Sequence, residues 1–337
     1  MKKIISVILV ILMAATLLVA CGEKPATGDQ QTGDLDPAST PLGICIVNRT
    51  NPTVQLMIGG FVDAAKKLGY TDFHIYAPDD ADVAEAYSLA EAGIDQHGIK
   101  GMVLFWLDDS AETYAEAWRE KGVFVTSAHQ FFDASEEQNY PGLNAWAAAS
   151  AAVYGATAAE AMGKELNGEG LVAITEGSFN LTEDTAAKAF TEYMNEKYPN
   201  IKVLAPQEEG YDTPTAIAKA TSIIQSNPGI NGAFSTTGTG GSTWAGAIKN
   251  TGVKMCAIGV DYNETNLDLV KNGEIYGIIA QPLYEEFYAA TEYLDKLLKG
   301  EKVDWANIID APLVTKENVE DYYELTKYVN DLMATVY

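Results

Sequence analysis

The sequence predicts an α/β protein with two lobes, each built on a doubly wound parallel sheet. The chain has 337 residues, which is more than one hydrophobic core usually serves. Short apolar runs alternate with segments of helical periodicity along most of the chain. The stretch from Cys256 to Tyr284 holds a strand, a helix and a strand within about thirty residues, the size of a βαβ unit.

The first half of the chain is predicted to alternate strands and helices from residue 42. The helix that begins near Val54 stops at Gly69, a residue type that often ends helices. The predicted strands are 44–47, 73–76, 102–106 and 123–126, and the predicted helices are 54–68, 83–97 and 111–120. Repeated βα units of this size predict a parallel sheet with helices on both faces.

The second half repeats this pattern after an irregular stretch at residues 127–145. The predicted strands are 171–175, 203–206, 232–235, 255–260 and 275–280. The predicted helices are 147–166, 183–198, 215–226 and a segment around Leu267 that stops at Asn272-Gly273. Two more helices are predicted at 285–298 and 317–333, and the pattern alone does not place the last one.

The N-terminal segment is predicted to be a secretory leader over residues 1–20, because Lys2-Lys3 precede an apolar run that ends at Ala20. Leu18-Val19-Ala20-Cys21 resembles a bacterial lipobox, which implies that Cys21 is lipidated and becomes the new N-terminus. Residues 21–41 are polar and predicted to be a flexible tether. We therefore expect a lipid anchor at the outer face of the cell membrane; the alternative is a secreted protein with an incidental Cys21.

The composition is strongly acidic, with a formal net charge of −25. A surface of this sign repels nucleic acid and anionic lipid, and no DNA-reading motif precedes the first strand, so we expect no nucleic-acid partner. Cys45 and Cys256 each lie in an apolar run. They are predicted to be buried thiols rather than a disulfide or a metal pair.

No catalytic constellation is found in the sequence. The three histidines, His74, His97 and His129, lie in separate segments, and the chain has no H-E-x-x-H, C-x-x-C, G-x-S-x-G or Walker A motif. The sequence therefore predicts a protein that is not an enzyme and that uses no metal and no cofactor; the alternative is an enzyme of unknown type that uses the same cleft.

Polar and aromatic side chains follow the predicted strands. Ligands of open α/β sheets bind at the carboxyl ends of the strands, where Asp261 and Gln281 stand. Amides and carboxylates bond to hydroxyls, and a flat ring covers the apolar face of a sugar, which favours a small polar ligand. The candidate ligand-binding residues are Asn48, Asn51, Trp106, His129, Tyr211, Thr237, Asp261 and Gln281.

Each candidate also has a purely structural interpretation. The alternatives are a turn or helix cap for Asn48, Asn51 and Asp261, core packing for Trp106 and Tyr211, and an ordinary loop or strand-end position for His129 and Gln281. The sequence leaves these alternatives open.

The closing segment carries a family resemblance. Val260-Asp261-Tyr262, Lys271-Asn272-Gly273 and Ala280-Gln281-Pro282 resemble type I periplasmic binding proteins of the ribose and galactose branch. The resemblance implies a multi-strand hinge, a sugar bound by Asp261 and Gln281, a monomer, and an ABC permease as partner. It implies a first lobe of 42–143 plus 282–310 and a second lobe of 144–281 plus 311–337. A sensory role with a chemoreceptor or kinase, or a nucleoside or sugar-like ligand, remains an alternative.

Two positions depart from the pattern of that branch. Ala128-His129 stands where these receptors commonly carry an Asp-Arg pair, and Ala186 stands where they place an arginine. Guanidinium groups grip adjacent hydroxyls with a rigid bidentate fork. Their loss argues against ribose itself as the ligand.

The glycine-rich loop at residues 236–243 precedes a helix that begins near Trp244. Backbone N–H groups at such a helix start can hold an anion. The loop lacks Lys and Arg, which favours a flexible insertion over a phosphate or carboxylate site.

Overall fold

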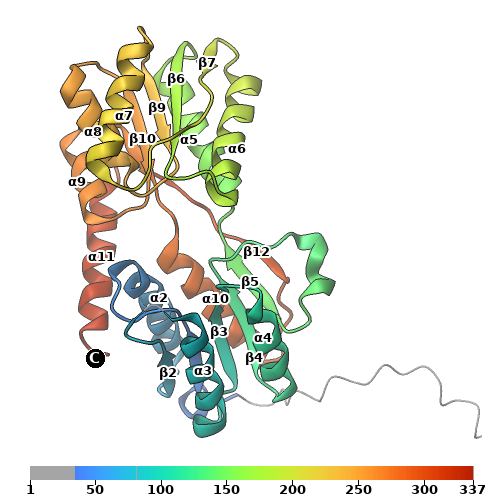
Figure 1. Cartoon of the computed structure of the whole chain (residues 1–337). Helices are drawn as coiled ribbons and strands as arrows, with labels where there is room; N and C mark the ends of the chain where they lie inside the picture. Colours follow the sequence, from blue (N-terminus) through green and yellow to red (C-terminus); the bar gives the residue numbers. More distant parts are fainter. Residues whose placement is uncertain (1–34, 81, 337) are drawn as a thin grey trace, which may run out of the picture.

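The computed structural model describes residues 35–80 and 82–336, and two α/β lobes lie one above the other in it (Figure 1). The first lobe has a six-stranded sheet in the order β12-β5-β4-β3-β1-β2, with all pairs parallel. Its strands are β1 Leu42–Cys45, β2 Phe73–Tyr76, β3 Gly101–Phe105, β4 Phe124–Ala128, β5 Ala145–Ala148 and β12 Ala306–Ile308. Its helices are α2 Pro52–Leu68, α3 Val83–His97, α4 Ser110–Glu120 and α10 Leu283–Leu298, with short 3-10 turns η1 Pro37–Ser39 and η2 Ala134–Asn139.

The second lobe has a seven-stranded sheet in the order β13-β11-β10-β9-β6-β7, with β8 beside β6. Only β13 is antiparallel to its neighbour among the described strands. Its strands are β6 Gly170–Glu176, β7 Ile201–Val203, β8 Gln207–Glu208, β9 Gly232–Ser235, β10 Cys256–Val260, β11 Gly277–Ile279 and β13 Leu313–Val314. Its helices are α5 Ala151–Glu165, α6 Leu181–Lys197, α7 Thr213–Ser226, α8 Gly240–Thr251, α9 Glu264–Asn272 and α11 Val319–Met333. The predicted fold class of two doubly wound lobes is confirmed.

The two sheets share one strand order. The series β2-β1-β3-β4-β5 in the first lobe corresponds to β7-β6-β9-β10-β11 in the second. Strands β4 and β10 are therefore equivalent, and each is followed by a candidate ligand-binding residue. Buried apolar clusters cover both faces of each sheet, as parallel sheets require.

The chain crosses between the lobes three times, after β5, after β11 and after β12 (Figure 1). The first crossing lies later than the sequence predicted. The predicted second lobe began at residue 144, and a helix was predicted from residue 147. Instead the run Ala145–Ala148 pairs with β4 and β12 and is fully buried between them. Hydrogen bonding from both sides outweighs the helix propensity of an alanine-rich run.

The last helix, α11, contacts both lobes, although the sequence assigned residues 311–337 to the second one (Figure 1). Near its start, the ring of Tyr322 lies 5.1 Å from that of Tyr262 in the second lobe. Near its end, the Tyr328 hydroxyl donates to Asp63 of α2 at 2.6 Å, and Val329 is fully buried against the first lobe. The position of α11 follows from these contacts at its two ends.

The predicted buried thiols are found in different lobes. Cys45 belongs to β1 and Cys256 to β10, and both are free and buried. Burial raises the pKa of both thiols. Neither cysteine is a reactive group on the surface.

The predicted leader and Cys21 lie outside the described residues, as does most of the predicted tether. The end of that tether is structured: Asp36 caps η1, and Thr40 is buried against the first lobe. The folded lobe thus begins a few residues before the predicted boundary at residue 42. Among the described residues, none of the helices has the length and apolar character to cross a bilayer.

Each lobe contains one helix pair whose backbones approach closely. A Cβ at Gly60 of α2 would lie 2.2 Å from the carbonyl oxygen of Tyr284 in α10, and a Cβ at Gly155 of α5 would lie 2.0 Å from that of Ala186 in α6. Only glycine permits these contacts. Helices α10 and α5 follow two of the three crossings, so these pairs fix the ends of the hinge to each lobe.

We expect Gly60→Ala to lower the melting temperature by several degrees, because its new methyl group meets backbone that cannot retract; overpacking of this kind costs about 1–3 kcal/mol. Gly246→Ala is the matched control. It also lies inside a helix, but its methyl group meets the movable side chain of Ile217 at 2.6 Å. Thermal unfolding of both variants checks this; equal melting temperatures would contradict the close packing of α2 on α10.

Candidate ligand-binding site

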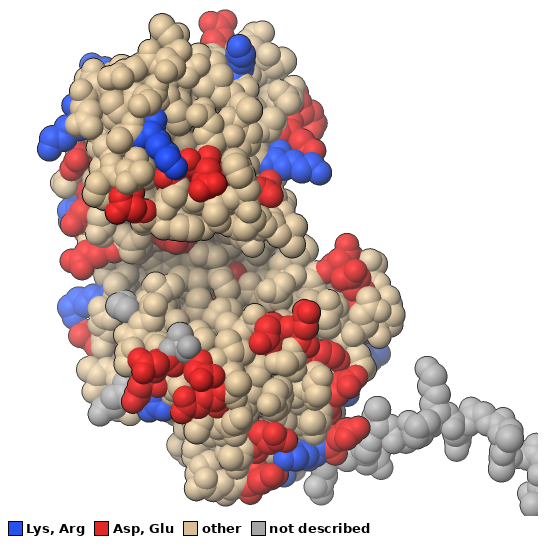
Figure 2. Space-filling view, viewed as in Figure 1, with Lys and Arg blue, Asp and Glu red and all other residues tan. Residues whose placement is uncertain are grey.

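The carboxyl ends of both sheets border a hollow between the lobes, which Figure 2 shows. The second-lobe side holds a cavity of about 220 Å³. It is lined by Tyr154 of α5, by Asn180, Glu183 and Ala186 at the start of α6, and by residues that follow β9, β10 and β11, which include Thr236, Thr237, Gly238, Asp261 and Gln281. The structure therefore brings three sequence-predicted residues, Thr237, Asp261 and Gln281, into one cavity.

Asp261 stands directly after β10 in the left-handed conformation, with φ 69°. Its backbone carbonyl accepts a hydrogen bond from the Asn266 amide at 2.9 Å, which fixes this turn. Its carboxylate lies over Gly238, where a Cβ would be only 2.5 Å from Oδ2. The cap of α9 is Asn263 and not Asp261, so the Asp261 carboxylate is left for another partner.

The surroundings of Asp261 disfavour its ionised form. Burial raises the pKa of Asp261 to about 6, the charge of His129 lowers it, and the charge of Glu183 raises it. His129 and Asp261 each follow the last residue of a strand, β4 in the first lobe and β10 in the second. Both have a positive φ, 74° for His129 and 69° for Asp261, at equivalent strands.

Glu183 is a cavity residue that sequence reasoning missed. Its Oε2 accepts from the Gly177 N–H at 2.6 Å and the Thr236 hydroxyl at 2.8 Å. Its Oε1 accepts from the Asn180 amide and the Tyr211 hydroxyl, both at 3.0 Å. The signal was present, because Asn180 and Glu183 have the spacing of a helix-capping pair.

Tyr211 is 60% exposed, which argues against its alternative as a core aromatic. Its hydroxyl also lies 2.9 Å from that of Ser178, and Tyr211 touches the site through Glu183 rather than lining the cavity itself. Gln281 follows β11 at the second crossing and lines the cavity together with Tyr154, a residue of α5 that the sequence gave no reason to select. The cavity thus contacts the hinge.

His129 is held at the end of β4 rather than lying in a surface loop. Its Nδ1 lies 2.7 Å from Oε2 of Glu286, whose side chain is fully buried in α10. The other oxygen of Glu286 accepts from the Ala149 N–H at 2.6 Å, at the first crossing. Burial alone would lower the pKa of His129, but the hydrogen bond and charge of Glu286 outweigh it and raise that pKa.

The first lobe holds a cavity of about 440 Å³, lined by residues that follow β3 and β4 and by residues of α4 and η2. Trp106 lines it and packs edge-on against Phe132 and Tyr140, with ring centroids 5.1 and 5.6 Å away. Trp106 is 8% exposed, so it contributes to the core and to the cavity wall together. Acidic residues Asp108, Asp109 and Glu112 share this wall.

Asn48 and Asn51 fit their alternatives as turn and cap residues. The Asn48 side-chain oxygen accepts from the N–H groups of Thr50 and Asn51 at 2.7 Å. The Asn51 side-chain oxygen accepts from Thr53 N–H at 2.8 Å and caps α2. Both oxygens are committed to the backbone, and neither residue lines the two cavities above.

The loop at residues 236–243 is packed and is not a flexible insertion. A Cβ at Gly240 would lie 1.9 Å from the Ser235 hydroxyl, and one at Gly241 would lie 2.6 Å from the Asn266 side-chain oxygen. The buried carboxyl of Glu209 bonds to the Ser235 hydroxyl beside this helix start. The glycines are required by packing, and an acidic neighbour disfavours an anion there.

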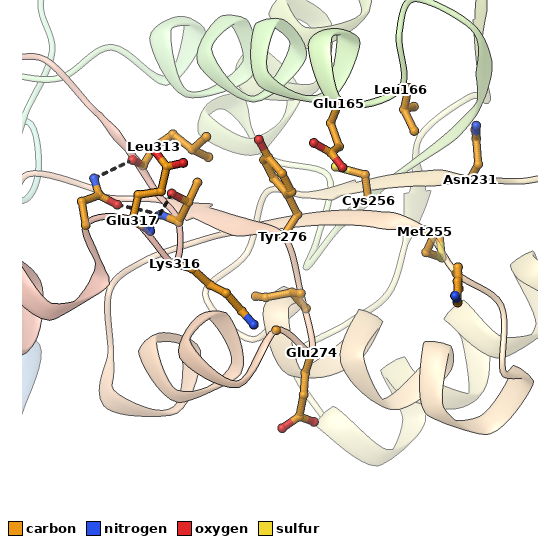
Figure 3. A pocket seen from close by; sticks show the side chains of 15 residues that line it. Glu165, Leu166, Asn231, Met255, Cys256, Glu274, Tyr276, Leu313, Lys316 and Glu317 are labelled. Atoms are coloured by element: carbon orange, nitrogen blue, oxygen red, sulfur yellow. Dashed lines mark hydrogen bonds between the residues drawn. The ribbon is translucent and has the colours of Figure 1, made fainter.

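The largest of these cavities, about 960 Å³, lies elsewhere (Figure 3). Its walls include Asn231, Met255 and Tyr276, which stand before β9, β10 and β11. These are the amino ends of the strands, opposite to the ends where this kind of sheet binds ligands. No group of side chains suited to a metal ion occurs among the described residues.

Comparison with known proteins places the chain in a family. Residues 42–302 match the family model described as a periplasmic binding protein domain. The chain belongs to this family, in its type I ribose and allose branch, whose members are binding proteins rather than enzymes.

Named relatives and a solved structure support this assignment. The chain is 26% identical to the ribose import binding protein RbsB of Bacillus subtilis (strain 168) over 93% of this chain and 98% of the relative. It is 24% identical to the D-allose-binding periplasmic protein of Escherichia coli (strain K12) over 83% of this chain and 93% of the relative. The solved structure of AraP, an arabinose binding protein from Geobacillus stearothermophilus, matches with a TM-score of 0.74 and 22% identity over 84% of this chain and 99% of that one.

We expect Asp261→Asn to raise the melting temperature of the ligand-free protein at pH 7.5. The pKa of Asp261 is about 6 in the folded protein and 3.8 ordinarily, so the folded state holds this proton more tightly than the unfolded chain does. The stability that this proton contributes is fully present below pH 4 and is lost as the pH rises through 6. Asparagine carries no charge and tolerates a positive φ. Calorimetry at pH 4 and 7.5 checks this: the difference from the natural chain should appear only at the higher pH, and a lower melting temperature at pH 7.5 would contradict it.

Proposed function

We propose that the chain captures a sugar or sugar-like compound in the hollow between its lobes and presents it to an ABC permease. The observation that carries this proposal is the cavity at the carboxyl ends of β9, β10 and β11, where Thr237, Asp261 and Gln281 meet. The relatives named for ribose and allose support a sugar as the ligand class.

In this proposal the two sides of the hollow have different tasks. Hydroxyl groups of the ligand donate to the Asp261 carboxylate and bond to the Gln281 amide, while the Trp106 ring of the other lobe covers an apolar face. The first and second lobes line separate cavities of about 440 and 220 Å³. A ligand that contacts both would favour a closed arrangement over the present one, with the three crossings as the hinge.

The membrane location is a second part of the proposal. The lipobox-like Leu18-Val19-Ala20-Cys21 supports a lipid anchor on Cys21, at the outer face of the cell membrane. The relative described as a ribose import binding protein supports a permease as the partner. In the sensory alternative, the ligand-binding site is the same, but the closed form docks on a kinase or chemoreceptor instead of a permease.

A thermal-shift screen of residues 22–337 tests the ligand class. A compound at a hundred times its dissociation constant stabilises by about 2.7 kcal/mol, which a melting curve resolves. We expect sugars or sugar-like compounds to raise the melting temperature, and Asp261→Asn to reduce that shift at equal ligand concentration. A screen in which only nucleosides stabilise would replace the sugar with the alternative ligand. If deletion of this protein leaves uptake of that ligand by the cells unchanged, the sensory role is favoured.

We expect the affinity for the ligand found in that screen to fall about tenfold from pH 7 to pH 5. Ligand donors bond to the ionised Asp261 carboxylate, so below its pKa of about 6 binding must first remove a proton. Two other charged groups act on Asp261: His129, whose charge favours the ionised form, and Glu183, which lines the same cavity and disfavours it. Titration calorimetry at both values, with Asp261→Asn as the pH-insensitive control, measures the effect; an affinity that rises toward pH 5 would refute it.

A further inference from the structure

The charged side chains that line the two cavities are all acidic. Carboxylates of Glu183 and Asp261 line the second-lobe cavity, and Asp108, Asp109 and Glu112 line the first-lobe cavity. Neither cavity has a Lys or Arg in its wall among the described residues. On the face in Figure 2, the basic side chains lie on the outer surfaces of the lobes and not inside the hollow.

Two basic residues that follow strands of the first lobe already have partners. Arg49, which follows β1, turns its guanidinium onto the Ala77 carbonyl at 2.8 Å and the Asp79 carboxylate at 3.2 Å. His129 directs Nδ1 to the buried Glu286, and its charge acts on both that carboxylate and Asp261. Lysines occur in the second lobe, but Lys254 and Lys316 lie at the opposite end of its strands, around the largest cavity (Figure 3).

The carboxylates of Glu183 and Asp261 differ in the hydrogen bonds that they receive from the protein. Glu183 accepts four hydrogen bonds, from Gly177, Asn180, Tyr211 and Thr236. Among the described residues, no donor bonds to the carboxylate of Asp261. Glu183 lines the same cavity, and its charge disfavours the ionised form of Asp261. An unpaired carboxylate in a recessed cavity, beside a second one, is costly unless a partner supplies positive charge.

We infer that the ligand carries a protonated amine, as an amino sugar or amino polyol does, and that this amine binds against Asp261. The inference rests on the proposed function and narrows its ligand class. An ammonium group donates charge-assisted hydrogen bonds, which are roughly twice as strong as neutral ones. Sugar phosphates and sugar acids are excluded, because they would add a like charge to the site.

Matched sugar triplets test this inference by titration calorimetry at pH 7. Each triplet contains a 2-amino-2-deoxyhexose, the parent hexose and the N-acetylated amine, in the gluco, galacto and manno configurations. We expect the amine of at least one triplet to bind about tenfold or more tightly than its parent. The N-acetyl compound, which has no charge, should not share this advantage, and added salt should reduce it.

Two variants locate the effect. Asp261→Asn should abolish the preference for the amine over the parent sugar. Thr237→Val removes a neutral hydroxyl from the same cavity and should weaken both compounds while leaving their ratio unchanged. Loss of the preference in Thr237→Val but not in Asp261→Asn would overturn the assignment to Asp261.

The outcomes separate the inference from the proposed function. Parent sugars that bind as tightly as their amines overturn the inference and leave a sugar receptor standing. Absence of binding by every sugar and amine in the set, with a folded protein, overturns both.

Discussion

The buried carboxylate of Glu286 connects the parts of this molecule that must keep a fixed relation. It lies in α10, directly beyond the second crossing, and bonds to His129 at the end of β4 and to the Ala149 N–H at the first crossing. A fully buried charge is stable only when its hydrogen bonds are made. Separating Glu286 from His129 or Ala149 would therefore destabilise the protein, by roughly 3–5 kcal/mol if it resembles the breaking of a buried ion pair. The strand-end histidine and two of the three hinge segments therefore share one anchor.

The same arrangement sets the electrostatics of the hollow. Glu286 holds one nitrogen of His129, and the charge of that ring favours the ionised form of Asp261. Burial and the charge of Glu183 outweigh this effect and raise the pKa of Asp261 to about 6. The left-handed turns at His129 and Asp261 direct both residues from the ends of equivalent strands. A site of this kind gains most from a ligand that brings hydrogen-bond donors.

Helix α11 adds a constraint beyond the region that matches the family model, which ends at residue 302. It contacts α9 of the second lobe and α2 of the first. On the first-lobe side, Asp63 receives the hydroxyls of both Tyr328 and Tyr284 and pairs with Lys67 at 2.8 Å. Any motion of one lobe relative to the other must be accommodated along this helix as well as at the three crossings.

The sequence by itself determined the fold class, most element positions and the strand-end location of Asp261 and Gln281, because these follow from local periodicity and from the rule that parallel strands end at one edge. Only the tertiary structure decided which lobe contains Ala145–Ala148, where α11 lies, and that Glu183 belongs to the cavity. It also decided that Asn48 and Asn51 use their oxygens within turns. The first three features depend on partners that are distant in the sequence, and the last depends on which local hydrogen bond forms. Neither kind of contact leaves a periodic pattern of residues in the sequence.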